Sequence, residues 1–303
     1  MNNPLVSISC ITFNQAKFVR ECFDGFLMQQ TNFSFEVIVH DDASTDGTKA
    51  IIEEYTQKYP ELFFPLYQTE NQYSKGVRGM MVKFNFPRCR GKYIALCEGD
   101  DYWTDPYKLQ KQVDFLEANE EYVIHSGKAQ ILRNSELMEI IGNPLNKETY
   151  EVRDFLTKNN LVTCTIMFRN KVDYKKSFKN LIFGDWMLYV LLLTQNNNLA
   201  YVSDKVYSVY RIHDGGVMQN FKDSYKNDLA HLKQILAVKK HINITYSKDD
   251  LKTINLYCLN IFKHRYVNHK YIDCFKVFFQ NFILVGFRVP FRMYLSFIKH
   301  NRI

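Results

Sequence analysis

Acidic side chains occur at two points of the sequence where a predicted strand ends. Asp41 and Asp42 lie in VIVHDDASTDGT, and Asp100 and Asp101 lie in LCEGDDYWTDP. The first pair can accept hydrogen bonds from a base N–H or a ribose hydroxyl, although an Asx turn would use the same residues. The second pair suits a hard divalent cation that also takes phosphate oxygens. We favour this metal interpretation over an acidic surface turn, since the neighbouring YWTDP makes the segment more specific.

Two further motifs lie downstream. Asp185 precedes an apolar stretch, so its carboxylate can cap a helix or act as a general base toward a hydroxyl. The segment YRIHDGG contains Arg211, whose planar guanidinium can pair with phosphate, and His213, which can ligate a metal or lie near a diphosphate. From the residues alone, a helix cap is the simpler role for Asp185, and His213 is as easily structural as functional.

Short apolar runs alternate with helical periodicity through the first 125 residues. This alternation predicts an α/β fold with a mostly parallel sheet and helices on both faces. Ligands of such sheets bind beyond the carboxyl ends of the strands, where the acidic motifs fall. The predicted strands cover residues 5–13, 35–40, 62–68 and 93–97, and helices are predicted near 19–27, after Ser44 and over 77–86.

The pattern changes in the second half of the chain. Between residues 122 and 210 it predicts strands over 162–168 and 205–210 and a helix over 185–194. After residue 221 the periodicity is helical throughout. The predicted C-terminal helices lie near residues 223–241, 249–267, 271–285 and 290–300. We therefore divide the chain into a domain of residues 1–220 and a helical region of residues 221–303.

Positive charge is concentrated in that helical region. Residues 221–303 contain 15 Lys or Arg and 5 Asp, a net charge of +10, whereas residues 1–220 sum to −3. Such a segment is expected to contact an anionic partner, either nucleic acid or anionic lipid. From residue 271 onward, Phe, Ile and Leu alternate with Lys and Arg, which is typical of helices in a membrane interface. Packing of these aromatics within the protein is an equally good interpretation.

Cysteine usage and the N-terminus predict a compartment. The seven Cys are odd in number and form no CxxC pair, which argues against a disulfide framework or a zinc site. The N-terminus has no basic segment followed by a long apolar one, so we predict no signal peptide. No stretch reaches about 18 apolar residues, the length expected of a membrane span. We expect a cytoplasmic protein, peripheral on the inner face of the cell membrane.

Three segments in this order resemble the catalytic domain of glycosyltransferase family 2, which has the GT-A fold, a Rossmann-like α/β architecture. They are SISCITFNQAKFVRECFDGFLMQQ, FEVIVHDDASTDGT, and GKYIALCEGDDYW with DPYKLQKQVDFLE. GDW and YRxHxGG downstream are similar to the acceptor-side elements of that family. The resemblance covers residues 6–217. Each piece is weak by itself, but the combination and spacing are specific.

The resemblance implies roles for individual residues. Asp185 corresponds to the catalytic base, and Asp42 to the acid that contacts the uracil ring. The metal, Mn²⁺ or Mg²⁺, would be held by Asp101 as the preferred ligand, by Asp100 and by His213. Nucleotide contacts are expected from Thr12, Asn14, Asp42, Asp100 and Arg211. The motif reads GDD rather than D-x-D, so Gly99 stands where the family has its first acid, and the role of Glu98 stays open.

The implied function is inverting transfer of a hexose, glucose or galactose, from a UDP-sugar. The implied acceptor is a saccharide on undecaprenyl diphosphate, in O-antigen or surface polysaccharide synthesis. Two alternatives remain: a nucleotide-sugar binding module without catalysis and a nucleotidyltransferase. The first would lack the metal acids or the base, and the second normally has a Gly-rich loop with a basic residue after its first strand, where this chain reads TFNQAKF. A nucleic-acid partner is suggested only by the basic tail, and we predict none.

Overall fold

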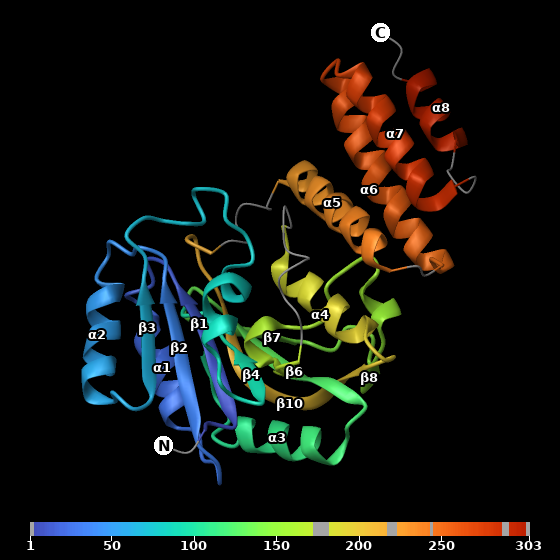
Figure 1. Cartoon of the computed structure of the whole chain (residues 1–303). Coiled ribbons are helices and arrows are strands. Elements are labelled where there is room, and N and C mark those ends of the chain that lie inside the picture. Colours follow the sequence, from blue (N-terminus) through green and yellow to red (C-terminus); the bar gives the residue numbers. More distant parts are fainter. Residues whose placement is uncertain (1–2, 172–181, 217–222, 243–244, 287–290, 301–303) are drawn as a thin grey trace. The chain divides into compact units, whose positions relative to one another are not determined.

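The structure is a computed structural model that describes residues 3–171, 182–216, 223–242, 245–286 and 291–300 (Figure 1). Its contacts divide the chain into two compact units, each of which is treated by itself. The sheet unit comprises Met1–Val152, Asn160–Asn180 and Gly184–His213. The helical unit comprises Arg153–Asn159, Leu181–Phe183 and Asp214–Ile303. The division at residues 213 and 214 lies near the predicted one at residue 220, but the inclusion of 153–159 in the helical unit was not predicted.

The first half of the sheet unit follows the predicted alternation. Its four parallel strands lie in the order β3-β2-β1-β4. They are β1 (Val6–Thr12), β2 (Phe35–Asp41), β3 (Phe63–Tyr67) and β4 (Tyr93–Leu96). Figure 1 shows β1, β2 and β3 side by side in blue. The register pairs Thr12 with Asp41, so the loops after β1 and β2 leave the sheet at the same level.

The second half of the sheet is mixed rather than parallel. β9 (Met167–Arg169) runs antiparallel to both β4 and β6 (Tyr122–Arg133), and β6 runs parallel to β10 (Leu199–Ile212). β10 also pairs with β5 (Tyr102–Trp103) and β8 (Thr149–Tyr150), and β6 with β7 (Glu136–Ile141). The strand predicted over 162–168 begins instead as a helical turn, Thr163–Thr165. Parallel pairing, as predicted, therefore occurs among β1 to β4 and between β6 and β10, while the other pairs of the second half are antiparallel.

Helices pack on the sheet because each strand presents buried apolar side chains to its faces. Val6, Ile8 and Cys10 pack in one buried cluster with α1 (Val19–Leu27), α2 (Thr48–Lys58) and α3 (Lys108–Ala118). Successive side chains of a strand point to opposite faces. On the other face, the Asn85 side chain donates to Ser9 Oγ over 3.0 Å and to the Cys10 carbonyl over 2.9 Å.

The segment that carries Asn85 differs from its prediction. A regular helix was predicted over residues 77–86, but the structure has a π turn, Met81–Asn85, followed by a 3₁₀ turn, Phe86–Arg88. Pro87 lacks a backbone N–H and cannot continue an α-helix. α4 (Gly184–Thr194) matches the helix predicted over 185–194, and Asp185 lies in its first turn.

The helical unit contains α5 (Ser224–His241), α6 (Lys248–Val267), α7 (Tyr271–Val285) and α8 (Phe291–His300), each within two residues of its prediction. Asp223 caps α5, and Ser247 with Asp250 forms a capping box on α6. Aromatic contacts join α6, α7 and α8: the Tyr294 ring lies 4.9 Å from Phe262 and 5.2 Å from Phe278. Among the described residues, no helix combines the length and apolar character needed to cross a bilayer.

Candidate active site at the carboxyl ends of the strands

The loops after β1 and β2 are fastened to each other at the edge of the sheet. Thr12 Oγ1 donates to Asp41 Oδ1 over 2.9 Å, and the other carboxylate oxygen of Asp41 accepts the Ser44 N–H over 3.0 Å. Asn14 has a left-handed φ of 52°, its N–H donates to Ser44 Oγ, and its side-chain oxygen accepts the Thr45 N–H over 2.8 Å. Thr12 and Asn14, both expected near a nucleotide, therefore shape the loop pair on which one would rest.

Asp42 holds a third loop at the same edge. Its two carboxylate oxygens accept backbone N–H groups of Gln72 and Tyr73, at 2.7 and 3.0 Å, and the residue is 5% exposed. The carboxylate expected to contact a uracil ring is thus engaged with the protein chain. Each oxygen retains a second lone pair, so a base N–H can still be accepted if it reaches this point.

The turn after β4 comes very close to the end of β1. A Cβ at Gly99 would lie 2.6 Å from Thr12 Cγ2 and 2.6 Å from Gln15 Oε1, distances that no side chain can occupy. Gly99 therefore stands at its position for a steric reason. The close approach places the following residue, Asp100, beside the loops that carry Thr12 and Asn14.

Asp100 meets His213 at this turn. His213 Nε2 lies 3.0 Å from Asp100 Oδ2, and the two side chains are 19% and 18% exposed. The Phe18 ring lies 4.6 Å from the imidazole and supports it. A carboxylate and an imidazole, both partly open to solvent, thus come together from β4 and β10.

Asp101 lies inside the protein instead. It is 2% exposed, and its Oδ1 accepts the backbone N–H of Arg211 over 2.8 Å. Burial, with the nearby charges of Asp100 and Glu98, raises the pKa of the Asp101 carboxyl well above its usual range. Sequence analysis preferred Asp101 over Asp100 as the metal ligand, but of the two it is Asp100 that is accessible here.

Arg211 braces the acidic turn. Its guanidinium donates to the Asp100 carbonyl over 2.5 Å, pairs with Glu21, and lies over the Phe18 ring at 4.6 Å. Only 8% of the side chain is exposed. The expected phosphate contact from Arg211 would require these interactions to break. In this conformation Arg211 instead stabilises the turn that carries Asp100.

Asp185 reaches the same region from the first turn of α4. Thr163 Oγ1 donates to Asp185 Oδ2 over 3.0 Å. Glu98 is partly buried, and burial together with the charges of Asp100 and Asp185 raises the pKa of its carboxyl to about 8. The charges of Asp100 and Asp185 thus both act on Glu98.

The metal prediction can be compared with this geometry. Among the described residues, no three or more His, Cys, Asp or Glu side chains are arranged to hold a metal ion. Asp100 and His213 bring two candidate ligands together. Mg²⁺ is often held by one or two carboxylates together with substrate phosphates, and imidazole is an accepted ligand of transition metals. The pair therefore fits a divalent ion whose remaining ligands come from a diphosphate.

Sequence analysis left out Thr163 and left Glu98 open. The spacing of Glu98 and Asp100, an acid, one residue and an acid, was a usable signal, since it supplies the D-x-D pattern with glutamate first. No local pattern marks Thr163, which lies 22 residues before its partner and comes close only because β9 and α4 fold together.

Comparison with known proteins bears on the family and the fold of this chain. The family model described as Glycosyl transferase family 2 matches residues 7–175. An uncharacterised protein of Mycobacterium tuberculosis is 35% identical over 215 residues, which are 70% of this chain and 60% of the relative. The chain thus spans less than two thirds of the length of that relative.

Two further similarities concern better-described proteins. The Escherichia coli protein WfgD, named UDP-Glc:α-D-GlcNAc-diphosphoundecaprenol β-1,3-glucosyltransferase, is 26% identical over 261 residues, covering 80% of this chain and 96% of WfgD. The crystal structure of Staphylococcus aureus TarS 1–349 with UDP-GlcNAc superposes with a TM-score of 0.60 and 17% identity, over 97% of this chain and 80% of TarS. The second similarity concerns the fold, which is the GT-A fold with a helical C-terminal region.

Proposed function

The chain belongs to glycosyl transferase family 2, and from this premise we propose that it transfers a hexose from a UDP-sugar to a lipid-linked saccharide, with inversion at the anomeric carbon. The observation that carries the proposal is the contact of Asp100 with His213 at the carboxyl end of the sheet, with the charge of Asp185, in the first turn of α4, acting on the neighbouring Glu98. A site for a negatively charged leaving group and a base for a hydroxyl acceptor are thereby available together.

In the proposed reaction Asp185 is the general base. It takes the proton of an acceptor hydroxyl as the oxygen forms a bond to the anomeric carbon and the bond between that carbon and UDP breaks. The hydrogen bond from Thr163 holds one oxygen of this carboxylate in place. A single displacement of this kind inverts the anomeric configuration, which NMR of the product linkage can verify.

Asp100 and His213 are the residues that would hold a divalent ion, Mn²⁺ or Mg²⁺, which neutralises charge on the departing diphosphate. Asp101 and Arg211 act on them indirectly. Asp101 fixes the backbone of β10 beside the acidic turn, and Arg211 fixes the Asp100 carbonyl. Thr12, Asn14 and Asp42 shape the loops proposed to contact the nucleoside.

The proposed acceptor is a saccharide on undecaprenyl diphosphate, and the proposed donor is UDP-glucose or UDP-galactose, in the synthesis of a surface polysaccharide such as O-antigen or capsule. The name of the relative WfgD supports the acceptor class and glucose. A lipid-linked acceptor favours an enzyme held at the cytoplasmic face of the membrane. The exposed apolar residues of α7 supply a surface for this: Ile272 and Phe275 are each 76% exposed and Phe279 is 61% exposed.

The test is a transfer assay with purified protein, a panel of UDP-sugars, and GlcNAc on undecaprenyl diphosphate as acceptor. We expect Mn²⁺- or Mg²⁺-dependent release of UDP together with a disaccharide product, and loss of both with Asp185→Asn. Binding of UDP-sugars without turnover on any acceptor would favour a binding module. Faster transfer to a free sugar or a protein would contradict the lipid-linked acceptor.

A further inference from the structure

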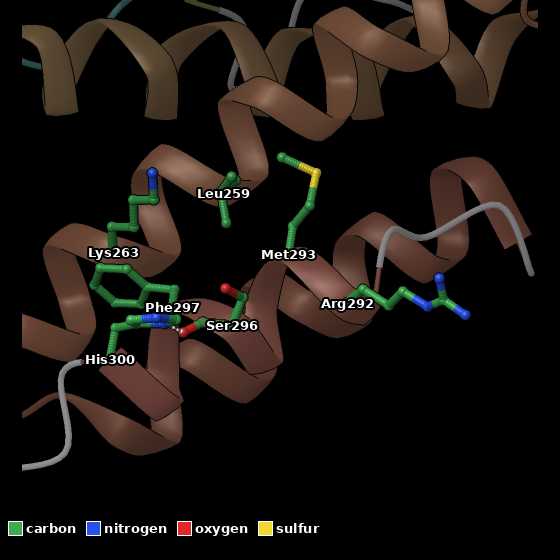
Figure 2. Close-up of a pocket in the computed structure, with 7 residues that line it drawn as sticks. All are labelled: Leu259, Lys263, Arg292, Met293, Ser296, Phe297 and His300. Carbon is green, nitrogen blue, oxygen red and sulfur yellow. Dashed lines mark hydrogen bonds between the residues drawn. The ribbon is translucent and has the colours of Figure 1, made fainter.

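A groove in the helical unit combines apolar and cationic side chains. It lies between α6 and α8, has a volume of about 470 Å³, and is lined by Leu259, Lys263, Arg292, Met293, Ser296, Phe297 and His300. Figure 2 shows Lys263 and His300 at one end, Arg292 at the other, and Leu259 and Met293 between them. The groove thus has an apolar floor and positive charge at both ends.

The charge in this groove has no acidic counterpart among the described residues. Lys263 and Arg292 form no ion pair there, and the only acid after residue 250 is Asp273, which is paired with Lys276 at 3.0 Å. Lys263 Nζ lies 5.7 Å from the centre of the Phe297 ring, at the edge of the apolar floor. An anionic group is therefore the complementary ligand.

His300 adds a hydrogen-bonding group. Its Nδ1 donates to the Ser296 carbonyl over 2.7 Å, an interaction drawn in Figure 2. With Nδ1 protonated, Nε2 accepts a hydrogen bond while the ring is neutral and donates one when the ring is charged. His300 thus adds a hydrogen-bonding group at the Lys263 end of the groove.

We propose that this groove binds the headgroup of an anionic phospholipid, with the phosphate at Lys263, the first methylene groups on Leu259, Met293 and Phe297, and Arg292 adding positive potential from the other end. An inorganic or soluble anion would use the cations alone and leave the apolar floor exposed. The exposed apolar residues of α7, with Leu295 of α8 at 64% exposure, belong to the same compact unit and suit the same environment. This inference deepens the proposed membrane association, on which the choice of a lipid occupant rests.

The test uses full-length protein and short-chain lipids below their micelle concentration, so that binding to the groove is measured without a membrane. Dihexanoyl phosphatidylglycerol, dihexanoyl phosphatidylcholine and inorganic phosphate are titrated by calorimetry and by NMR of the labelled Met293 methyl group. We expect dihexanoyl phosphatidylglycerol to bind most tightly and to shift the Met293 methyl signal. Lys263→Ala with Arg292→Ala should weaken it about thirtyfold, since each cation near such a headgroup contributes about fivefold.

The matched control is Lys233→Ala with Lys240→Ala, which removes two exposed cations from α5 and the same net charge. It should bind like the parent protein. Met293→Ser should weaken the lipid but leave phosphate binding unchanged, and circular dichroism checks that each variant is folded. Equal binding of both lipids, equal loss in the control, or phosphate binding as tight as the lipid would each overturn the proposal.

Failure of the groove proposal can be distinguished from failure of the proposed membrane association. If short-chain phosphatidylglycerol binds as expected but the protein does not sediment with phosphatidylglycerol vesicles, the groove proposal stands and the membrane association is wrong. If the protein sediments equally with phosphatidylcholine vesicles and neither short-chain lipid binds, the association stands and the groove proposal is wrong. Transfer to a soluble acceptor should be unchanged in every groove variant.

Discussion

His213 Nε2 lies 3.0 Å from Asp100 Oδ2, although 113 residues separate the two in the sequence. The contact exists because β10 returns to the sheet next to β5, which directly follows the acidic turn. The Asp100 and His213 side chains are both partly exposed, whereas the adjacent Asp101 is buried. This difference in exposure separates the roles of two adjacent aspartates.

Substitutions at Asp100 and Asp101 should therefore differ in their effect on stability, although both should abolish transfer. Asp100→Ala should abolish metal-dependent transfer and leave the free energy of unfolding nearly unchanged. Asp101→Ala should also abolish transfer, but with a loss of about 1–3 kcal/mol of stability, because it leaves the buried Arg211 N–H without an acceptor. Urea unfolding and activity titrated with Mn²⁺ measure both effects.

Asp101→Asn is the control for the stability effect of Asp101→Ala. Its amide oxygen can still accept the Arg211 N–H, and the substitution removes a charge that burial disfavours, as the raised pKa of Asp101 indicates. We expect parental stability. Strong destabilisation by Asn would contradict the structural role, and full transfer in EDTA by the parent protein would contradict the metal requirement.

Asp185→Asn should retain UDP binding and lose transfer by about 10²–10⁴-fold, because its shape is kept but its capacity to accept a proton is not. Thr163→Val should lower kcat by about tenfold with little change in the donor KM, since one hydrogen bond to the carboxylate is lost. Thr163→Ser should restore the rate. Transfer by Asp185→Asn within threefold of the parent would mean that the base lies elsewhere.

Gly99→Ala should lower activity strongly while the protein remains folded. The new Cβ would overlap Thr12 Cγ2 and Gln15 Oε1 at 2.6 Å, and the acidic turn would have to move. The end of the Gln15 side chain can rotate away, but Thr12 is buried. Adding Thr12→Ser removes the overlapping methyl group and keeps the hydroxyl that donates to Asp41, so the double variant should recover part of the activity. A double variant no better than Gly99→Ala would rule out this steric explanation.

Lys108 should make stability depend on pH. It is fully buried, with Nζ 2.8 Å from Gln112 Oε1 and 4.1 Å from the Trp103 ring, and burial lowers its pKa to about 7. The unfolded chain, with a lysine pKa of about 10.4, binds more protons above pH 7 than the folded one. The free energy of unfolding should then rise with pH from about 7 to 8.5, by about 1 kcal/mol per unit.

The comparison that isolates this effect is Lys108→Met. Other groups titrate in the same range, so the two proteins are unfolded in urea at each pH and the difference is taken. The difference should change with pH as described, with the variant gaining relative stability toward low pH. A difference that stays constant from pH 6.5 to 8.5 would show that burial does not lower the pKa of Lys108 into this range.

The apolar face of α7 should be required for vesicle binding. Phe275→Ser with Phe279→Ser should abolish sedimentation with anionic vesicles, and high salt should release part of the parent protein because charge screening weakens the cationic contribution. Leu137→Ser with Ile140→Ser on β7 removes two apolar side chains that are 63% and 53% exposed in the sheet unit. If this control loses binding equally, the effect is not specific to α7.

The residues from 271 onward concern a question that the sequence left open, namely whether their aromatic side chains contact a membrane or pack within the protein. Their composition favoured membrane contact and internal packing equally, and the structure assigns the residues to two faces. Cys274, Val277 and Leu284 pack inside the helical unit, while Ile272, Phe275 and Phe279 are exposed. Arg288 and Phe287, which the prediction also used, lie outside the described residues.

Sequence by itself determined the features that depend on neighbours along the chain. Strands β1 to β4 and the four C-terminal helices follow from hydrophobic period and caps, which act over a few residues. The same local information located Asp42, Asp100 and Asp185 at strand ends or helix starts. It did not give the mixed second half of the sheet, because pairing of β9, β6 and β10 depends on contacts between distant segments.

Only the tertiary structure decided which of these residues are accessible and which meet. Asp100 and Asp101 are chemically identical neighbours, and their difference arises because the turn after β4 directs one carboxylate toward His213 and the other toward the Arg211 backbone. Arg211 is occupied by Glu21 and the Asp100 carbonyl, which no spacing rule predicts. Burial and electrostatic coupling depend on distance in space, and the sequence records only distance along the chain.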